Sequence, residues 1–485
     1  MVALTVVVVL FLCALMLGVR YPGTALYAVI FLTPWQGLDP DIGLRVVAYQ
    51  VVLVGLVAPN IGRILQRQFG QKPRVPGSLA PFVYYSVVIT LFSLPFLPVV
   101  EVAGGTLRSQ YLRPIFQIAI FALHASLIVM VPMLITNLEG LVRAARVYVL
   151  SCTILAAIGW YQIAVWYGTG TNPLPIGFMD HLLGGSESIV REGAYEFLDL
   201  YIRRMNALGG EPKNLGAGLV IALLVLQVGW LYRLLQIDIF SAVLWFFLAA
   251  SAVMTFSTTA IYMWVIGSVV VILSPVFSRG QSRLKAWSRL AIAGFVLVAG
   301  VAAISAGSWS EKGSPSQTES LVSSLLIERT IERGVLEDFD EAIIEYLGEH
   351  PLRAVLGHGL GNIHLFADSY LADDVAEYAG GGVFVGKAQY LRFISEIGVL
   401  GLALFCWPIL RKCVVFWGGR RSLEARTSEL YGSVVAMMLS ILMLYLANGA
   451  IMPQAYVMIG VFIAAAEILL AGQHNVVRRM VAARV

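Results

Sequence analysis

The chain of 485 residues is 59% hydrophobic, carries a formal net charge of +4 and has a mean hydropathy of +0.81. Only 13% of its residues are charged, against about 25% in soluble domains, which excludes an ordinary soluble protein. Apolar runs recur along almost the whole length without alternating ten-residue strands, so the composition indicates a helical membrane protein and argues against an outer-membrane barrel.

The apolar runs predict an all-α, polytopic bundle of 12 or 13 transmembrane helices. The first run has no basic flank before it, so we expect a retained span and not a cleaved signal. The second run is short and contains Pro34, so the predicted number of spans is 13 with this run and 12 without it. The spans are predicted at 3–19, 24–38, 46–59, 79–100, 114–135, 147–167, 215–232, 240–256, 260–277, 290–307, 390–410, 430–447 and 453–471.

Basic residues between the spans predict the orientation of the bundle. Four lie in 61–76, two in 137–146, four in 279–289, five in 411–427 and three after 477. All these segments fall on one side, which the positive-inside rule makes cytoplasmic. The predicted regions are N-terminal transmembrane helices (1–167), a first periplasmic loop (168–214), central transmembrane helices (215–307), a large periplasmic loop (308–389), and C-terminal transmembrane helices with a cytoplasmic tail (390–485). We therefore expect a multi-pass membrane protein with both large loops on the outer side.

The large loop 308–389 holds 14 of the 29 acidic residues and only five basic ones. A connection of this length inside a compact domain is usually functional. Its apolar residues have roughly helical spacing, which predicts amphipathic helices over the outer mouth of the bundle, ending before Pro351. The residues with this spacing are Leu321, Leu325, Leu326, Leu336, Phe339, Ile343 and Leu347.

The stretch EHPLRAVLGHGLGN at 349–362 carries Gly357, Gly359 and Gly361 at alternate positions. Such runs often bring backbone amides close to a phosphate. A nucleotide site would need a preceding strand and a cytoplasmic location, whereas this run follows a helix and a proline on the outer side. Two interpretations stay open: a flexible turn that lets backbone pass close to other helices, or contact with an anion such as a lipid-linked pyrophosphate.

The stretch YIRRMNALGGEPKNLGAGL at 201–219 ends the first periplasmic loop. Arg203, Arg204 and Lys213 run against the tendency of basic residues to lie inside. They either anchor lipid headgroups or hold phosphate oxygens, for which a guanidinium offers a bidentate fork. The arginines near other outer boundaries, which would complete a cationic mouth, are Arg45, Arg108, Arg113 and Arg392.

Three stretches, taken in order, resemble the O-antigen ligase and polymerase superfamily of polysaccharide assembly enzymes. RMNALGGEPKNLGAGL is similar to the family's arginine followed by a glycine-rich segment and the next span. EHPLRAVLGHGLGN is similar to the His-Pro-Leu and alternating glycines of its periplasmic loop. YLRFISEIGVLGLALF at 390–405 is similar to the exit of that loop into the membrane. The resemblance covers about residues 200–410.

The resemblance implies a membrane glycosyltransferase of the C class that takes a glycan from undecaprenyl pyrophosphate and passes it, with inversion, to a hydroxyl group. Ligases attach the polymer to lipid A-core, whereas polymerases extend a lipid-linked repeat unit. The implied partners are the undecaprenyl-pyrophosphate-linked oligosaccharide, the bilayer, and a chain-length regulator and flippase of the same pathway. We expect no nucleic-acid partner and no cofactor.

Positions that match or depart from the family pattern decide between its two branches. Arg204 corresponds to the family's arginine before the proline step, and Arg329 or Arg333 to the arginine that opens the loop helix. Ligases carry a His-Asn pair where this chain has Lys387 and Ala388. Loss of that histidine favours a polymerase, as does, more weakly, the Glu-Pro step before Lys213. A second departure is that Ser257, Thr258 and Thr259 stand where the family often has Ser-Arg-Gly.

The reaction needs counter-charge for the leaving pyrophosphate and an acceptor for the proton of the attacking hydroxyl. The predicted catalytic residues are Arg204, Glu211, Arg329, Arg333, His358 and Glu396, with Glu211, His358 and Glu396 as proton acceptors in declining order. The predicted substrate-binding residues are Arg203, Lys213, Asn214, Gly357, Gly359, Gly361, Asn362, Lys387 and Arg392. The structural alternatives are an ion pair of Glu396 with Arg392 one helical turn earlier, and a loop histidine at 358 that makes one hydrogen bond.

Two other functions compete with this interpretation. A transporter of lipid-linked glycans would also need a cationic cavity, but it should show internal repeats and charged or broken helices at mid-membrane, and the sequence indicates neither. A structural subunit of an assembly complex is the third possibility. The four cysteines have no C-x-x-C pairing and no two histidines are spaced i,i+4, so no metal site is predicted.

Overall fold

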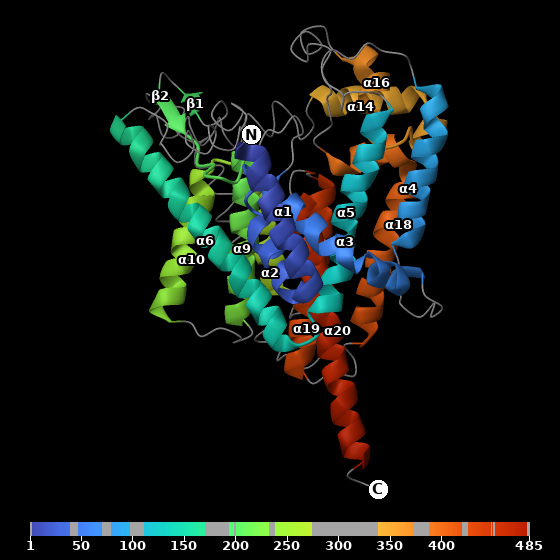
Figure 1. Ribbon diagram of the computed structural model, residues 1–485. Coiled ribbons are helices and arrows are strands. Elements are labelled where there is room, and N and C mark those ends of the chain that lie inside the picture. The colour runs from blue at the N-terminus through green and yellow to red at the C-terminus, as the bar shows by residue number, and fades with distance from the viewer. Residues whose placement is uncertain are drawn as a thin grey trace.

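The computed structural model describes residues 2–38, 47–69, 79–97, 111–169, 194–197, 200–231, 238–273, 338–371, 388–419, 425–447, 449 and 452–482. Figure 1 shows a bundle of long helices with a layer of short helices at one end. The helices of the bundle are α1 (Val2–Arg20), α2 (Pro22–Leu32), α3 (Ala48–Phe69), α4 (Ala80–Ser93), α5 (Leu112–Leu134), α6 (Leu138–Thr169), α9 (Pro212–Leu231), α10 (Ile239–Met254), α11 (Thr258–Leu273), α18 (Gln389–Gly419), α19 (Ala425–Ala447) and α20 (Met452–Ala482). The short elements are the 3-10 turns Leu94–Phe96 and Asp368–Tyr370, the helices α14 (Asp338–Glu349), α15 (Pro351–Leu356) and α16 (His364–Ala367), and an antiparallel hairpin of β1 (Ala194–Phe197) and β2 (Leu200–Arg203).

The helices confirm a helical membrane protein. In the described part of the chain, seven helices are long and apolar enough to cross a membrane, and five shorter apolar helices accompany them. Every predicted span coincides with one of these helices except 290–307, which lies outside the described residues. The short second span is α2, whose 11 residues measure about 16 Å against a hydrocarbon core of about 30 Å. It ends where Thr33 and Pro34 turn the chain.

The two ends of the bundle differ in the segments they carry. Figure 1 places the C-terminus at one end, and α14, α16 and the β1–β2 hairpin at the opposite end. The C-terminal tail is basic, whereas the hairpin and the short helices belong to 168–214 and 308–389. The separation of basic segments from these two loops therefore agrees with the arrangement that the charges predict.

Cysteine labelling tests this orientation. In a cysteine-free background, Asp368→Cys should react with an impermeant thiol reagent in intact spheroplasts, because Asp368 is exposed in the predicted periplasmic layer. Arg143→Cys should react only after lysis, since Arg143 is exposed in the predicted cytoplasmic segment 137–146. The opposite labelling pattern would invert the topology and contradict a reaction on the periplasmic side.

An aromatic cluster at the centre of the bundle fixes α18 against its neighbours. Its members are Phe82 of α4, Phe121 of α5, Phe393 and Phe405 of α18, Tyr445 of α19 and Tyr456 of α20. The ring centroids of Phe82 and Phe121, and of Phe393 and Phe405, lie 5.1 Å apart, a distance typical of favourable aromatic pairs. The first turns of α18 are thereby held beside α5.

Helix α14 confirms the amphipathic helix predicted in the large loop. Ile343 and Leu347 are buried, and Phe339 packs beside them against α16 and the start of α18. The helix ends at Glu349, and Pro351 begins the next helix, α15, as its first residue. The remaining predicted helix positions, Leu321, Leu325, Leu326 and Leu336, lie outside the described residues.

Helix α18 is broken at Gly398, which has φ 71° and ψ 170°. A Cβ at this position would collide with the carbonyl oxygen of Val355, so the break lets α15 approach the helix backbone. The residues before the break form a short separate helix that carries Arg392 and Glu396. The sequence showed paired glycines here but did not predict the break.

Candidate functional site

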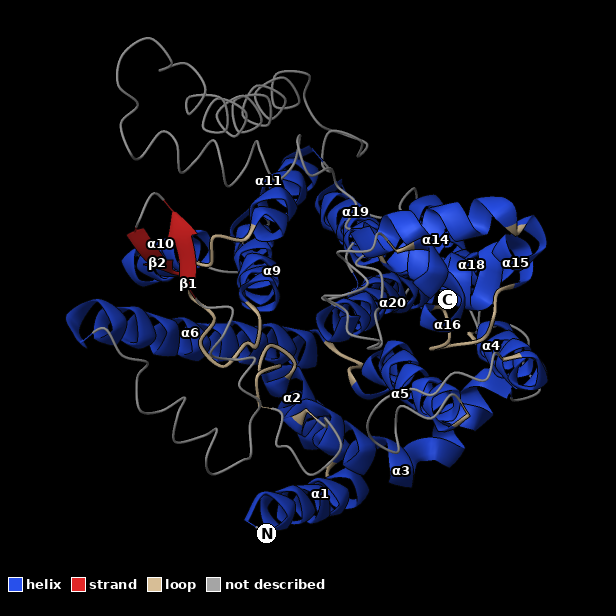
Figure 2. Cartoon of the chain, turned by 90° about the horizontal axis from the view of Figure 1, so that it is seen from above, coloured by secondary structure: helices blue, strands red, loops and turns tan. Residues whose placement is uncertain are grey.

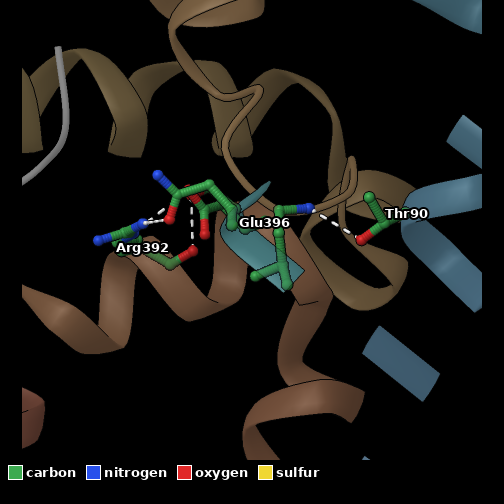
Figure 3. A network of polar contacts seen from close by, with 6 residues as sticks. Thr90, Arg392 and Glu396 are labelled. Atoms are coloured by element: carbon green, nitrogen blue, oxygen red, sulfur yellow. Dashed lines mark hydrogen bonds and ion pairs between the residues drawn. The ribbon is translucent and has the colours of Figure 1, made fainter. Parts of the chain in front are cut away.

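The first polar group of the site lies where the large loop re-enters the bundle. Arg392 Nε and Glu396 Oε1 are 3.2 Å apart, which confirms the ion pair predicted one helical turn apart. Arg392 Nη2 also donates to Oε1 of Gln117 on α5 at 3.2 Å. The Glu396 side chain is 1% exposed and the Arg392 side chain 21% exposed. Figure 3 shows Arg392 and Glu396 close to each other, with Thr90 of α4 nearby.

A small cavity adjoins this ion pair. It is lined by Gln117, Ile120, Phe121, Leu360, Gln389, Arg392, Phe393, Glu396 and Met452. Its volume of about 20 Å³ holds roughly one water molecule. No described residue hydrogen-bonds Glu396 Oε2, although that oxygen is buried. A carboxylate oxygen beside a water-sized cavity can accept a proton, but a glycan or a pyrophosphate needs more room than this conformation provides.

Four consecutive backbone amides of the glycine run, at 357–360, are occupied by internal hydrogen bonds, which argues against the predicted phosphate contact at these positions. The amides of Gly357, His358 and Gly359 donate to the carbonyls of Arg353 and of Ser395 and Glu396 on α18. The next amide, of Leu360, donates to Oγ1 of Thr90 on α4. Amides already bonded to carbonyl and hydroxyl oxygens cannot also cradle an anion.

The glycines let the backbone pass close to other helices, as the first of the two interpretations of this run predicts. Gly357, Gly359 and Gly361 have φ between 80° and 88°. A Cβ on Gly357 would meet the backbone of α18, on Gly359 that of α4, and on Gly361 the side chain of Gln117 on α5. Only glycine combines this backbone conformation with so close an approach.

Alanine substitutions test the packing role. Gly357→Ala should destabilise the protein by roughly 2–4 kcal/mol, because of its positive φ and a Cβ 2.5 Å from the carbonyl oxygen of Glu396. Gly348→Ala is the matched control: no atom lies within 4 Å of its added Cβ on α14, so it should be neutral or stabilise by up to about 1 kcal/mol. Thermal unfolding in detergent measures both. Equal midpoints for the two variants would contradict the packing role.

His358 is a buried structural residue, which corrects its prediction as a proton acceptor. Its Nδ1 pairs with the carbonyl oxygen of Ser395, so Nδ1 must carry the proton, and Nε2 accepts from the hydroxyl of Tyr346. A ring that donates from Nδ1 and accepts at Nε2 is the neutral imidazole. Both ring nitrogens are thus occupied, one more hydrogen bond than the sequence predicted.

Asn362 and His364 are polar residues inside the layer of short helices. Asn362 is fully buried and His364 nearly so. No described residue hydrogen-bonds the side-chain amide of Asn362, whereas the ring of His364 interacts with the backbone of Gly361. Buried groups without a hydrogen bond usually mark a functional position or a bound water. Asn362 was predicted from the motif, whereas His364 and the Gln117 of the ion-pair group were missed, because no local pattern relates them to the motifs.

The second polar group contains Arg204, which follows β2. Its Nε donates to the carbonyl oxygen of Thr255 at 3.2 Å, and its Nη2 to that of Phe256 at 3.3 Å. These carbonyls belong to the turn between α10 and α11, where Phe256 has a φ of 45°. The guanidinium therefore holds the end of the loop 168–214 to that turn. A headgroup anchor would not need two such bonds.

The segment after Arg204 is held by a buried glutamine. Gln162 of α6 donates from Nε2 to Oδ1 of Asn206 at 2.7 Å, and its Oε1 accepts from the amide of Ala207. This arrangement stabilises Ala207 at a φ of 46°, a conformation that a residue with a side chain seldom adopts. Gln162, which lies 44 positions before Asn206, thus stabilises the turn in the stretch 201–219.

The start of α9 carries three other predicted residues. Lys213 Nζ and Glu211 Oε2 lie 2.6 Å apart, and both side chains are well exposed. Glu211 and Glu396 are each paired with a cation, but of the two Glu396 is the one that lines the cavity. The Oδ1 of Asn214 is buried without a hydrogen bond to any described residue. Glu396 therefore moves ahead of Glu211 among the candidate proton acceptors.

The segment after α2 connects the two polar groups. The amide of Gly37 donates to the carbonyl of Leu208, so this segment lies against the basic motif. Its neighbour Gln36 donates to Gln454 at the start of α20 at 2.9 Å. Two residues earlier on α20, Met452 lines the cavity beside Arg392. A series of contacts therefore joins the stretch 201–219 to the ion pair across one end of the bundle. Figure 2 shows this end of the bundle from above.

Several predicted residues are not placed. Arg329, Arg333 and Lys387 lie outside the described residues, and of Arg203 only the backbone, in β2, is described. Among the residues that the structure does describe, no group of three or more His, Cys, Asp or Glu could hold a metal ion.

No protein-family model matches this chain, and no curated protein matches it. The resemblance to polysaccharide assembly enzymes therefore depends on the three sequence motifs alone.

Proposed function

We propose that this protein is a polymerase of a bacterial surface polysaccharide, either O-antigen or exopolysaccharide. It would transfer a glycan from undecaprenyl pyrophosphate to a hydroxyl of an acceptor repeat unit on the periplasmic side. The observation that carries the proposal is the polar group of Gln117, Arg392 and Glu396, in which the Glu396 carboxylate is buried and the other two side chains are partly exposed. It lines a cavity at the end of the bundle that carries the predicted periplasmic loops, and residues of all three family-like motifs lie at that end.

The chemistry assigns different roles to the two polar groups. The acceptor oxygen attacks the anomeric carbon of the donor, the bond from that carbon to the pyrophosphate breaks, and undecaprenyl pyrophosphate leaves with inversion. Glu396 takes the proton of the attacking hydroxyl through Oε2, while Arg392 holds Oε1. Arg204 and Lys213 counter the charge that develops on the pyrophosphate. The cavity must widen to admit the sugars.

Reconstitution with a defined donor tests the proposal. The purified protein, given an undecaprenyl-pyrophosphate-linked repeat unit in liposomes, should produce a ladder of longer lipid-linked glycans. A deletion strain should leave single repeat units on the lipid anchor or core. Long polymer stranded on undecaprenyl in that strain would instead indicate a ligase, which attaches glycan to lipid A-core. Unchanged surface glycan in the strain and no elongation in liposomes would reject both.

Activity should not depend on a divalent metal. Turnover in the liposome assay should be unchanged when EDTA is added, because positioned guanidinium groups can supply the counter-charge that a metal supplies elsewhere. The same assay with a known metal-dependent glycosyltransferase controls for effective chelation. Loss of turnover in EDTA with recovery on addition of Mg²⁺ or Mn²⁺ would contradict the arginine-based mechanism.

One observation favours a second candidate, a transporter of lipid-linked glycans. The break of α18 at Gly398 follows directly on a helix with a buried ion pair, and broken helices with charged residues are typical of transporters. The two functions differ in their products. A transporter would move a fluorescent lipid-linked glycan between leaflets without changing its length, whereas a polymerase would lengthen it.

A further inference from the structure

The helices α14 and α15 are consecutive in the chain but expose opposite kinds of side chain. The exposed residues of α14 include three acidic ones, Glu341, Glu345 and Glu349, and a single large apolar one, Ile344. Beyond His350 the character changes abruptly: on α15, Leu352 is 70% exposed and Val355 50% exposed. An acidic face is suited to water, whereas apolar side chains with this exposure need an apolar environment.

The segment that contains α15 lies alongside α4 and not beyond the end of that helix. The hydroxyl of Tyr85 donates to the carbonyl of Leu356 at 2.8 Å, and Oγ1 of Thr90 accepts from the amide of Leu360 at 3.1 Å. Tyr85 and Thr90 lie about 8 and 15 Å along α4 from its first residue, at 1.5 Å per residue. The chain at 356–360 therefore lies alongside the middle and the last turn of the apolar helix α4.

The exposed face of α15 continues an apolar wall of the bundle. Figure 2 shows α15 at the periphery, next to α4 and α18. Both neighbours expose large apolar side chains, which are Tyr84, Val88, Leu91 and Phe92 on α4 and Val399 and Leu400 on α18. Such a wall on a bundle of membrane-crossing helices is the surface that lipid covers.

We propose that α15 is a re-entrant membrane segment, with Leu352, Val355 and Leu356 packed against lipid acyl chains in the outer half of the bilayer. The break at Gly398 supports this position, since it lets the α15 backbone settle against α18 within the wall. Arg353 of α15 is partly buried. The water boundary then lies at His350–Pro351, so the predicted loop 308–389 is not wholly periplasmic. This proposal is independent of the reaction that the protein catalyses.

Spin-label accessibility tests the proposal without any activity assay. Nitroxides are attached to single cysteines at Leu352→Cys and Val355→Cys in a cysteine-free background, in vesicles of phosphatidylethanolamine and phosphatidylglycerol. Val88→Cys on α4 is the matched lipid control, and Glu345→Cys on α14 the water control. The ratio of collision with oxygen to collision with a water-soluble nickel chelate should be as high at 352 and 355 as at 88, and low at 345.

Two results would overturn the proposal. A ratio at 352 and 355 equal to that at 345 would place α15 in water. Low collision with both reagents would show that protein, such as a second copy of the chain, covers the face. Impermeant maleimide provides an independent measurement in spheroplasts: Leu352→Cys should stay unlabelled while Asp368→Cys reacts, and equal labelling of both would contradict membrane insertion.

Discussion

Glu396→Gln should lower turnover by about a hundredfold to ten-thousandfold, the range typical for loss of a general base. Glutamine keeps the shape of the side chain and can still accept a hydrogen bond from Arg392, but its amide cannot take a proton from an acceptor hydroxyl. Turnover is measured on purified protein at matched folded concentration in the liposome assay. A packing role alone predicts near wild-type turnover for each folded molecule, and that result would remove Glu396 from the mechanism.

A double variant separates chemistry from stability. Glu396→Gln leaves Arg392 without its counter-charge and should lower the free energy of unfolding. Because Arg392 is 21% exposed, we expect this decrease to be smaller than the roughly 3–5 kcal/mol typical of fully buried pairs. Arg392→Gln combined with Glu396→Gln removes both charges and should recover stability, since replacing a whole buried pair is often neutral. If turnover returns together with stability in the double variant, the defect was structural and the proton-acceptor role fails.

The fold was predictable because its main determinants are local. A run of apolar residues must form a helix to satisfy its backbone in lipid, so the spans follow from composition alone. The pair of Arg392 and Glu396 was predictable for the same reason, since residues four apart on a helix are neighbours. The burial of Ile343 and Leu347 on α14 likewise follows from helical periodicity.

The site was less predictable because its remaining contacts join distant segments. Gln117 pairs with a residue 275 positions away, and Gln162 builds a turn 44 positions away. Alternating glycines are compatible with anion binding and with close packing, and only the hydrogen bonds of the amides at 357–360 distinguish the two. Likewise, the hydrogen bonds of both ring nitrogens indicate that His358 has a structural role and does not act as a base.

Arg204 should be essential for turnover, although it also has a structural role. If it counters the pyrophosphate charge, Arg204→Lys should lose much of the turnover and Arg204→Ala roughly a hundredfold to a thousandfold. A lysine keeps the charge but lacks the planar fork that binds the carbonyls of Thr255 and Phe256 and can bind phosphate. Both variants should also lower the thermal midpoint, so turnover must be compared at matched folded protein.

Phe256→Gly provides the control that separates the two roles of Arg204. Glycine tolerates the φ of 45° that Phe256 adopts, so the substitution relieves strain in the turn between α10 and α11 without altering the guanidinium. Combined with Arg204→Lys, it should recover part of the lost stability and none of the lost turnover. If the combination restores turnover, Arg204 acts only by holding the turn. Near wild-type turnover in folded Arg204→Ala would exclude Arg204 from the site, because alanine has no charged group that could bind the pyrophosphate.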